Sequence, residues 1–273
     1  MKDICINFIT HILDTYDSMV QQVLTILAFN CYSQDDTVIG GMYTLTLDIK
    51  TIVMPVATTI LTIVFLCDLL RYEMKQDVTN WQNLFVVFFK LVIGKAAMDM
   101  SFEILDLIYS TAADWITQIG GAQGTLGATA GIIIKNEISG YGTMKCLGLM
   151  ITSALIFVVI IMCAIIMNVV AYARTFEIMA YTAFSPIPCA FLPMEHSRVT
   201  IKFFANFAAV CLQGCFMAFS VKAYSVICTS IISAINSNNS IWNVLYNLVL
   251  GSVICLMAIV KSGSWASKML EGF

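Results

Sequence analysis

The chain has 273 residues and a formal net charge of −3 at pH 7, and 59% of its residues are hydrophobic while only 11% are charged. Soluble domains usually carry about 25% charged residues, which supply their polar coat. The composition therefore excludes an ordinary soluble globule and predicts an all-α, polytopic helical membrane protein. The small negative charge also argues against a surface that coats nucleic acid, which needs a basic patch.

Residues 1–32 predict an amphipathic helix ahead of the membrane domain. Asp3 is unlike the basic start of a secretory signal peptide. The polar face of this helix is acidic, which favours packing on protein over binding to anionic lipid, while a position in the membrane interface is the alternative. The apolar stripe consists of Cys5, Phe8, Ile9, Ile12, Leu13, Tyr16, Met19, Val20, Val23, Leu24 and Leu27.

Residues 33–273 predict a transmembrane domain with about five spans. A helix of about 20 apolar residues crosses a hydrocarbon core of roughly 30 Å. Runs of this kind occur at 52–70, 84–109, 147–172, 203–221 and 241–260. The run 84–109 differs from the others because it carries five charged residues.

Four of these charges fall on one narrow stripe when 100° of rotation is assigned to each helical residue, whereas Lys90 lies well away from it. The stripe consists of Lys95, Asp99, Glu103 and Asp106. A charge at the bilayer centre costs at least about 2.5–3.5 kcal/mol, so such groups face a partner helix or water. In one interpretation the stripe lines a conduit or joins subunits. In the other, only 84–98 is deep in lipid and 99–109 is a solvated outer helix.

Prolines interrupt the apolar sequence between residues 176 and 196. Ser185-Pro186-Ile187-Pro188 cannot continue a helix, because each proline lacks an N–H donor and restricts the residue before it. Irregular backbone at membrane depth is tolerated only where protein or water covers it. We therefore expect a re-entrant or interfacial elbow on the cytoplasmic face. A kinked connection between two spans is the alternative.

Lysine and arginine residues near the span ends set the expected orientation. If the elbow enters and leaves by one face, that face holds Arg71, Lys75, Arg174, Arg198, Lys202, Lys261 and Lys268. The bias favours an N-terminus outside and a C-terminus in the cytoplasm.

The motifs of catalysis and cofactor binding are missing from the sequence. It contains no HExxH and no phosphate-binding glycine loop, and its two histidines are far apart. Five of the ten cysteines fall inside predicted spans, and no CxxC occurs. The glycine-rich segment 120–131 is interpreted as a flexible loop or as a close-packed hairpin in a channel mouth. We predict no enzyme activity, no cofactor and no metal site.

The stretch RTFEIMAYTAFSPIPCAFLPMEHSRVTIKFFANFAAVCLQG resembles the signature region of the TrbL-type family, which comprises inner-membrane subunits of type IV secretion and conjugation machines. The resemblance is to the branch found on conjugative elements of Gram-positive bacteria, and it covers about 37–260. FFKLVIGKAAMDMSFEIL (88–105) is similar to the family's second span. Pro188-Cys189 and Phe191 depart from the small aliphatic residues expected there. The matching elements are Arg174, Glu177, Thr182 to Pro186, Ser197, Lys202 to Phe204, and Leu212 to Gly214.

The resemblance implies a multi-pass subunit in the cytoplasmic membrane of a bacterium, with the N-terminus outside. Such a subunit would help to move relaxase-bound single-stranded DNA, or protein, with energy from ATPases elsewhere in the machine. It implies a homo-oligomer in contact with lipid and transiently with DNA. The implied cytoplasmic elbow includes Arg174, Glu177, Pro186, Pro188 and Arg198.

Two other functions stay open. A small-molecule transporter subunit would show repeats with broken helices in matching positions, whereas the sequence shows one broken segment. A membrane scaffold without a conduit is the other alternative.

Overall fold

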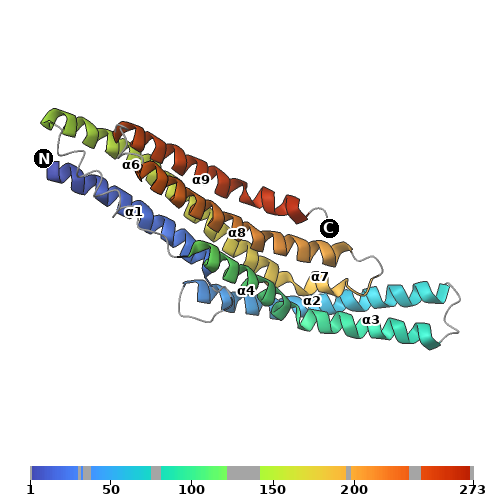
Figure 1. The fold of residues 1–273 in the computed structure, drawn as a ribbon. Helices are drawn as coiled ribbons and strands as arrows, with labels where there is room; N and C mark the ends of the chain where they lie inside the picture. The colour runs from blue at the N-terminus through green and yellow to red at the C-terminus, as the bar shows by residue number, and fades with distance from the viewer. Residues whose placement is uncertain are drawn as a thin grey trace. The chain divides into compact units, whose positions relative to one another are not determined.

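The computed structural model describes residues 2–29, 32, 38–74, 81–121, 142–194, 198–233 and 241–270. All regular elements among these residues are α-helices, as Figure 1 shows. The all-α prediction is therefore confirmed. The helices are α1 (Lys2–Ala28), α2 (Val38–Met74), α3 (Trp81–Asp99), α4 (Ser101–Gly120), α6 (Thr143–Phe184), α7 (Pro186–Ala190), α8 (Arg198–Ser233) and α9 (Ile241–Leu270).

Within the described part of the chain, four helical segments are long and apolar enough to cross a membrane. Each contains or overlaps a predicted span, and their surfaces expose large apolar side chains such as Ile52 and Leu155. Lipid is the solvent in which such side chains are stable outside a protein core. The four segments are Gly41–Arg71, Met144–Ala190, Arg198–Cys228 and Val249–Leu270.

The structure divides the predicted span 84–109 between two helices. A break at Met100 separates α3 from α4. The hydroxyl of Ser101 donates a hydrogen bond to the carbonyl of Met98 at 2.8 Å, and bonds of this type commonly bend helices. Backbone bonds of the α-helical spacing nevertheless continue across the break, from Met100 to Ala96 and from Ile104 to Met100. The crossing of the membrane by α3 stays a prediction.

The chain forms two compact units, and α4, α6, α8 and α9 contribute residues to both. The first, called here the α1 unit, contains Met1–Phe29, Ala113–Ala173 and Gln213–Ala266. The second, called the elbow unit, contains Asn30–Ala112, Arg174–Leu212 and Ser267–Phe273.

In the α1 unit, helix α1 buries much of the apolar stripe that its sequence predicts. A Cβ atom added to Gly120, the last residue of α4, would lie 3.8 Å from Leu24 Cδ2. The apolar face of α1 is thus covered by its own chain, which supports packing on protein. The division between residues 32 and 33 stays a prediction. The buried members of the stripe are Ile9, Ile12, Val20, Val23, Leu24 and Leu27.

Helices α8 and α9 approach closely in the same unit, through a hydrogen bond and a glycine. The hydroxyl of Tyr224 lies 3.0 Å from Ser252 Oγ, and both side chains are buried. A Cβ atom on Gly251 would lie 2.9 Å from Tyr224 Cε2. Small residues and hydroxyl bonds of this kind are what hold helices together in lipid, where apolar burial alone gives little driving force.

Candidate functional site

The elbow unit is built around the short helix α7, which packs against both α2 and α3 while these two helices pack on each other (Figure 1). The elbow backbone is therefore covered by protein, which is the condition for a broken helix at membrane depth. The buried core of this contact consists of Ala57, Leu61, Met98, Cys189 and Ala190.

The break itself lies at Ser185, and the predicted limits 176–196 are corrected accordingly. Helix α6 continues through Phe184, so residues 176–184 are helical, and α7 begins at Pro186. A proline fits the first position of a helix, where no N–H partner is needed. Ser185, the residue before it, keeps helical backbone angles of φ −55° and ψ −30° although a following proline disfavours them. Turns follow α7 as far as Met194. Residues 195–196 lie outside the described residues.

A pair of serines joins this break to the break between α3 and α4. Ser185 is fully buried, and its Oγ lies 2.9 Å from the carbonyl oxygen of Thr182 and 3.1 Å from Ser101 Oγ. Ser101 is fully buried as well. The two irregular points of the elbow unit therefore face each other and share a hydrogen bond.

The elbow approaches α3 most closely at a glycine. A Cβ atom on Gly94 would lie 2.6 Å from Pro193 Cγ and 2.9 Å from Leu61 Cδ1. Real Cβ atoms do not come so close to other heavy atoms, so position 94 accommodates the elbow only because it lacks a side chain.

After the elbow the chain returns along α6 as helix α8. Arg174 bonds to Val210, the Tyr181 ring lies 6.1 Å from the Phe207 ring, and Thr200 donates to the Pro188 carbonyl at 2.7 Å. The sequence separation of these pairs falls steadily toward the elbow. The two arms therefore form an antiparallel helical hairpin that the elbow closes, and the position of this elbow relative to the membrane stays a prediction.

Arg174 fastens this hairpin from within. It is only 3% exposed, and its Nε and Nη2 atoms donate to the carbonyl oxygens of Val210 and Cys211 at 3.0 and 3.3 Å. A buried charge is costly unless hydrogen bonds compensate for it. Glu177 does not share this environment: it is exposed and lies at the edge of an apolar groove that Phe184 and Pro188 also line.

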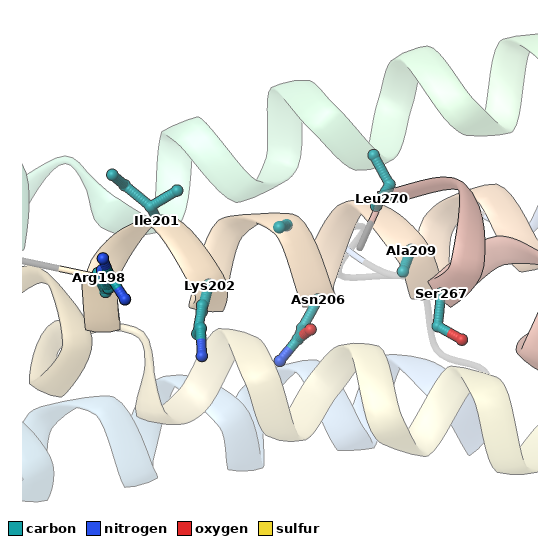
Figure 2. A pocket seen from close by; sticks show the side chains of 8 residues that line it. Arg198, Ile201, Lys202, Asn206, Ala209, Ser267 and Leu270 are labelled. Carbon is teal, nitrogen blue, oxygen red and sulfur yellow. The ribbon is translucent and has the colours of Figure 1, made fainter. Parts of the chain in front are cut away.

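Arg198 lies apart from that groove, in a cavity of about 760 Å³ at the start of α8. Figure 2 shows Lys202 and Asn206 projecting from the same side of α8 and Ser267 contributed by α9. The five predicted elbow residues thus lie at different places. Arg174 bonds α6 to α8, and Pro186 begins α7 after the helix break. Glu177 and Pro188 line the apolar groove, and Arg198 lines the separate cavity.

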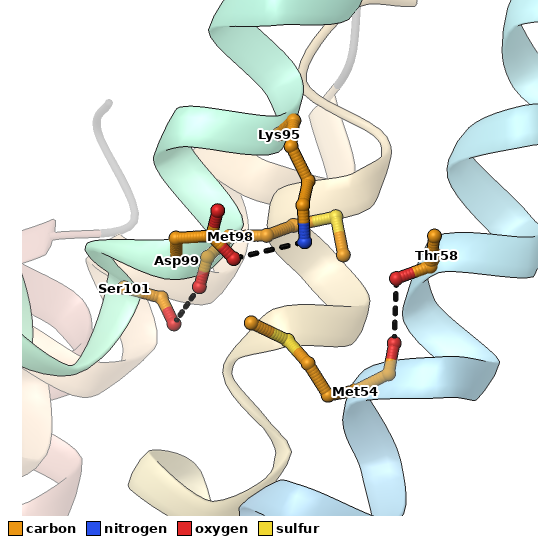
Figure 3. A network of polar contacts seen from close by, with 6 residues as sticks. All are labelled: Met54, Thr58, Lys95, Met98, Asp99 and Ser101. Carbon is orange, nitrogen blue, oxygen red and sulfur yellow. Dashed lines mark hydrogen bonds and ion pairs between the residues drawn. The ribbon is translucent and has the colours of Figure 1, made fainter.

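The structure brings two of the four stripe residues into contact. Lys95 Nζ lies 2.9 Å from Asp99 Oδ1, and each side chain is about half exposed, at 47% and 50% (Figure 3). Glu103 is exposed and Asp106 is partly buried, and neither forms an ion pair with another described residue. The ion pair lies one residue before the helix break at Met100.

Two residues that position the elbow, Gly94 and Ser101, were not identified from the sequence. Both residues lie in the charged run 84–109, where the sequence interpretation relied on the charged residues and not on the small ones. A glycine in the middle of a predicted helix was the available signal, since glycine destabilises helices unless close packing requires it.

The remaining expectations concern metals, cysteines and the glycine-rich segment. In the described ranges, no three His, Cys, Asp or Glu side chains are placed to hold a metal ion, and the eight cysteines whose side chains are described form no disulfide. Most of the segment 120–131 lies outside the described residues. Its first residue, Gly120, ends α4, and Gly121 follows with a positive φ of 32° that suits glycine.

Comparison with known families gives one finding. A family model described as TrbL/VirB6 plasmid conjugal transfer like protein matches residues 37–186, which is more than half of the chain. The matched region begins just before α2 and ends at the first residue of α7, so it includes the charged stripe and Arg174. No curated protein and no solved structure matches the chain.

Proposed function

Because the chain belongs to the TrbL/VirB6 plasmid conjugal transfer-like family, we propose that it is a membrane-embedded subunit of a conjugative type IV secretion complex. In this role it helps to pass relaxase-bound single-stranded DNA, or protein, across the cytoplasmic membrane. The family match over residues 37–186 carries the proposal, together with four helices suited to a membrane. The family is one of structural conjugation subunits, and we propose no catalytic role.

The proposed partners follow from this assignment. The chain would assemble with further copies of itself and with other secretion subunits, and ATPases of the machine would supply the energy. Contact with DNA would be transient, since the chain is acidic overall and tight binding to nucleic acid needs many basic contacts. The N-terminus would lie outside and the C-terminus in the cytoplasm.

The elbow is proposed to form a rigid turn at the cytoplasmic end of this subunit. The burial of Ser185, the clamp of Arg174 on α8 and the close fit of Pro193 on Gly94 support a fixed shape. A rigid turn would hold the start of α8 in one position, where partner subunits could dock on it.

The charged stripe is proposed to face a neighbouring subunit or an aqueous path. Lys95 and Asp99 neutralise each other in one helical turn, which lowers the cost of placing them next to lipid. Glu103 and Asp106 continue the same face of the helix beyond the break and add negative charge. Removal of both charges by Lys95→Gln with Asp99→Asn tests this role, and unchanged transfer and assembly would eliminate it.

The experiment for the function as a whole is a mating assay. The gene is deleted from its conjugative element, and the donor is complemented with the wild-type chain or with variants. We expect transfer to be abolished by the deletion and restored by the wild type. Formaldehyde cross-linking during mating should recover the transferred strand with the tagged chain. Full transfer from the deletion strain would refute the proposal.

The two rival functions make different predictions in the same strains. A small-molecule transporter would change uptake of a solute and leave mating intact. The break at Met100 does not provide the matching discontinuous helix that a transporter repeat needs, because its backbone hydrogen bonds continue. A scaffold without a conduit would be needed for assembly of the complex but would not cross-link to the transferred strand.

A further inference from the structure

The cavity at the start of α8 is lined by basic and by apolar residues, and the proposed transfer function gives it no role. It has a volume of about 760 Å³, within the range of sites that hold small molecules. All of its lining residues belong to the elbow unit, from the first turns of α8 and the last turn of α9. One part of the lining is basic and the other is apolar.

The basic part is a row of side chains on one face of α8. Arg198, Lys202 and Asn206 follow one another at intervals of four residues, and all three are exposed. Neither basic side chain forms an ion pair with any residue that the structure describes, and the described lining contains no carboxylate. Arg198 is also the first residue of α8, where the free backbone N–H groups add positive potential. This part of the cavity suits an anion.

The apolar side chains of the cavity lining cannot hydrogen-bond to a ligand, so they disfavour a ligand whose whole surface is polar. Ile201, Ala205 and Ala209 line the cavity from α8, and Leu270 lines it from α9. Both helices are among the four segments suited to cross a membrane, and the cavity lies where one begins and the other ends. At such a position a ligand can keep its charged group in water and its chains in lipid.

We propose that this cavity binds the headgroup of an anionic phospholipid. Arg198 and Lys202 contact the phosphate, Asn206 and Ser267 bond to the polar headgroup, and Ile201 and Leu270 border the first carbons of the acyl chains. Basic hollows between membrane helices are the places where anionic lipid headgroups bind. The inference depends on the membrane location alone and not on the conjugation role.

Nucleic acid is the other phosphate-bearing polymer to consider, and the lining argues against it. Strand-binding grooves combine a row of cations with aromatic side chains on which bases stack. The described lining offers two cations and no aromatic ring. A single phosphate with apolar chains attached fits these residues better than a run of nucleotides.

The test uses the full-length chain in nanodiscs that mix phosphatidylglycerol with phosphatidylcholine. Lipids that remain bound after gentle release are counted by native mass spectrometry. The variant Arg198→Gln with Lys202→Gln is compared with Lys261→Gln, which removes an exposed lysine of α9 outside the cavity. We expect the double variant to lose preference for phosphatidylglycerol by about 25-fold, because each of the two basic contacts with an anionic lipid is worth roughly a factor of five.

The controls separate the lipid from other sources of phosphate. The charge-conserving variant Arg198→Lys with Lys202→Arg should keep the preference, and its gel-filtration profile shows that the region tolerates substitution. If the double variant does not purify, Lys202→Gln alone should still weaken the preference measurably. Equal preference in the double variant and the wild type would overturn the proposal. Displacement of the lipid by inorganic phosphate or by a single-stranded oligonucleotide would overturn it as well.

Discussion

Gly94 of α3 and Pro193 of the elbow lie so close that a Cβ atom on position 94 would be 2.6 Å from the proline Cγ. The proline ring cannot rotate away as a flexible side chain would, and Leu61 closes the other side at 2.9 Å. Position 94 thus determines how near the elbow comes to α2 and α3, and the elbow in turn determines where α8 begins.

The first prediction concerns this contact. Gly94→Ala gains about 1 kcal/mol of helix propensity but overpacks the elbow, which costs about 1–3 kcal/mol. We expect a net loss of up to about 2 kcal/mol in the free energy of unfolding, measured by denaturant titration in detergent. Gly148→Ala is the matched control, because a Cβ atom there meets nothing within 4 Å. It should be neutral or stabilising, and an equal loss in both variants would contradict the argument.

The same contact can be followed locally through a buried thiol. Cys189 is fully buried in the elbow core, next to Ala57 and Met98. In a chain that keeps Cys189 as its single cysteine, Gly94→Ala should speed labelling by a thiol reagent severalfold, because a displaced elbow opens this core more often. Labelling at the wild-type rate would show that the elbow does not depend on position 94.

The second prediction concerns the buried arginine. Arg174→Lys retains the charge but loses the planar fork that reaches Val210 and Cys211 together. We expect a loss of about 1.5–3 kcal/mol in the free energy of unfolding. Arg174→Met should lose less than Arg174→Lys, since it leaves no buried charge without its full set of bonds. The opposite order would show that charge, rather than geometry, holds the hairpin together.

The third prediction tests the hydrogen bond that joins α8 to the elbow. Thr200→Val has almost the same shape but cannot donate to the Pro188 carbonyl, which is 2.7 Å away. We expect a loss of about 0.5–1.5 kcal/mol in the free energy of unfolding. Thr58→Val on α2 serves as the control, because its hydroxyl bonds only within its own helix, to Met54 (Figure 3). A loss confined to the control would contradict the proposed connection.

The fourth prediction concerns the ion pair of the stripe. Asp99→Asn leaves Lys95 without its partner next to lipid, whereas the exchange Lys95→Asp with Asp99→Lys restores a pair one turn apart. We expect mating efficiency and the level of membrane-assembled protein to fall in the single variant and to recover substantially in the exchange. Lys90→Gln, on the same helix but off the stripe, is the control. Failure of the exchange to recover either quantity would favour a role for each charge separately.

The fifth prediction concerns orientation in the membrane. In a chain without other cysteines, Lys2→Cys should react in intact cells with a maleimide that cannot cross the membrane. Lys268→Cys should react only after the cells are opened, because the basic span ends are expected in the cytoplasm. Labelling of both positions in intact cells would refute the proposed topology.

The sequence by itself determined that the chain is stable in lipid and that its secondary structure is helical. Apolar runs of about 20 residues with few charges leave no alternative to helices in lipid, because every backbone polar group must then be bonded within its own segment. The helical spacing of Lys95 and Asp99 likewise made their contact predictable, since residues four apart are neighbours on any helix. The prolines predicted a break in the apolar sequence between residues 176 and 196, but neither its position at Ser185 nor where the chain goes next.

Only the tertiary structure decided the rest. The bond between Ser185 and Ser101, the fit of Pro193 on Gly94 and the reach of Arg174 to α8 join residues that are 36 to 99 positions apart. The local spacing of residues does not predict such pairs, because small residues and hydroxyls are common in membrane helices. Which of them form contacts depends on how a second helix packs against them. The elbow therefore appeared in the sequence as a break, and packing against α2 and α3 made it a defined turn.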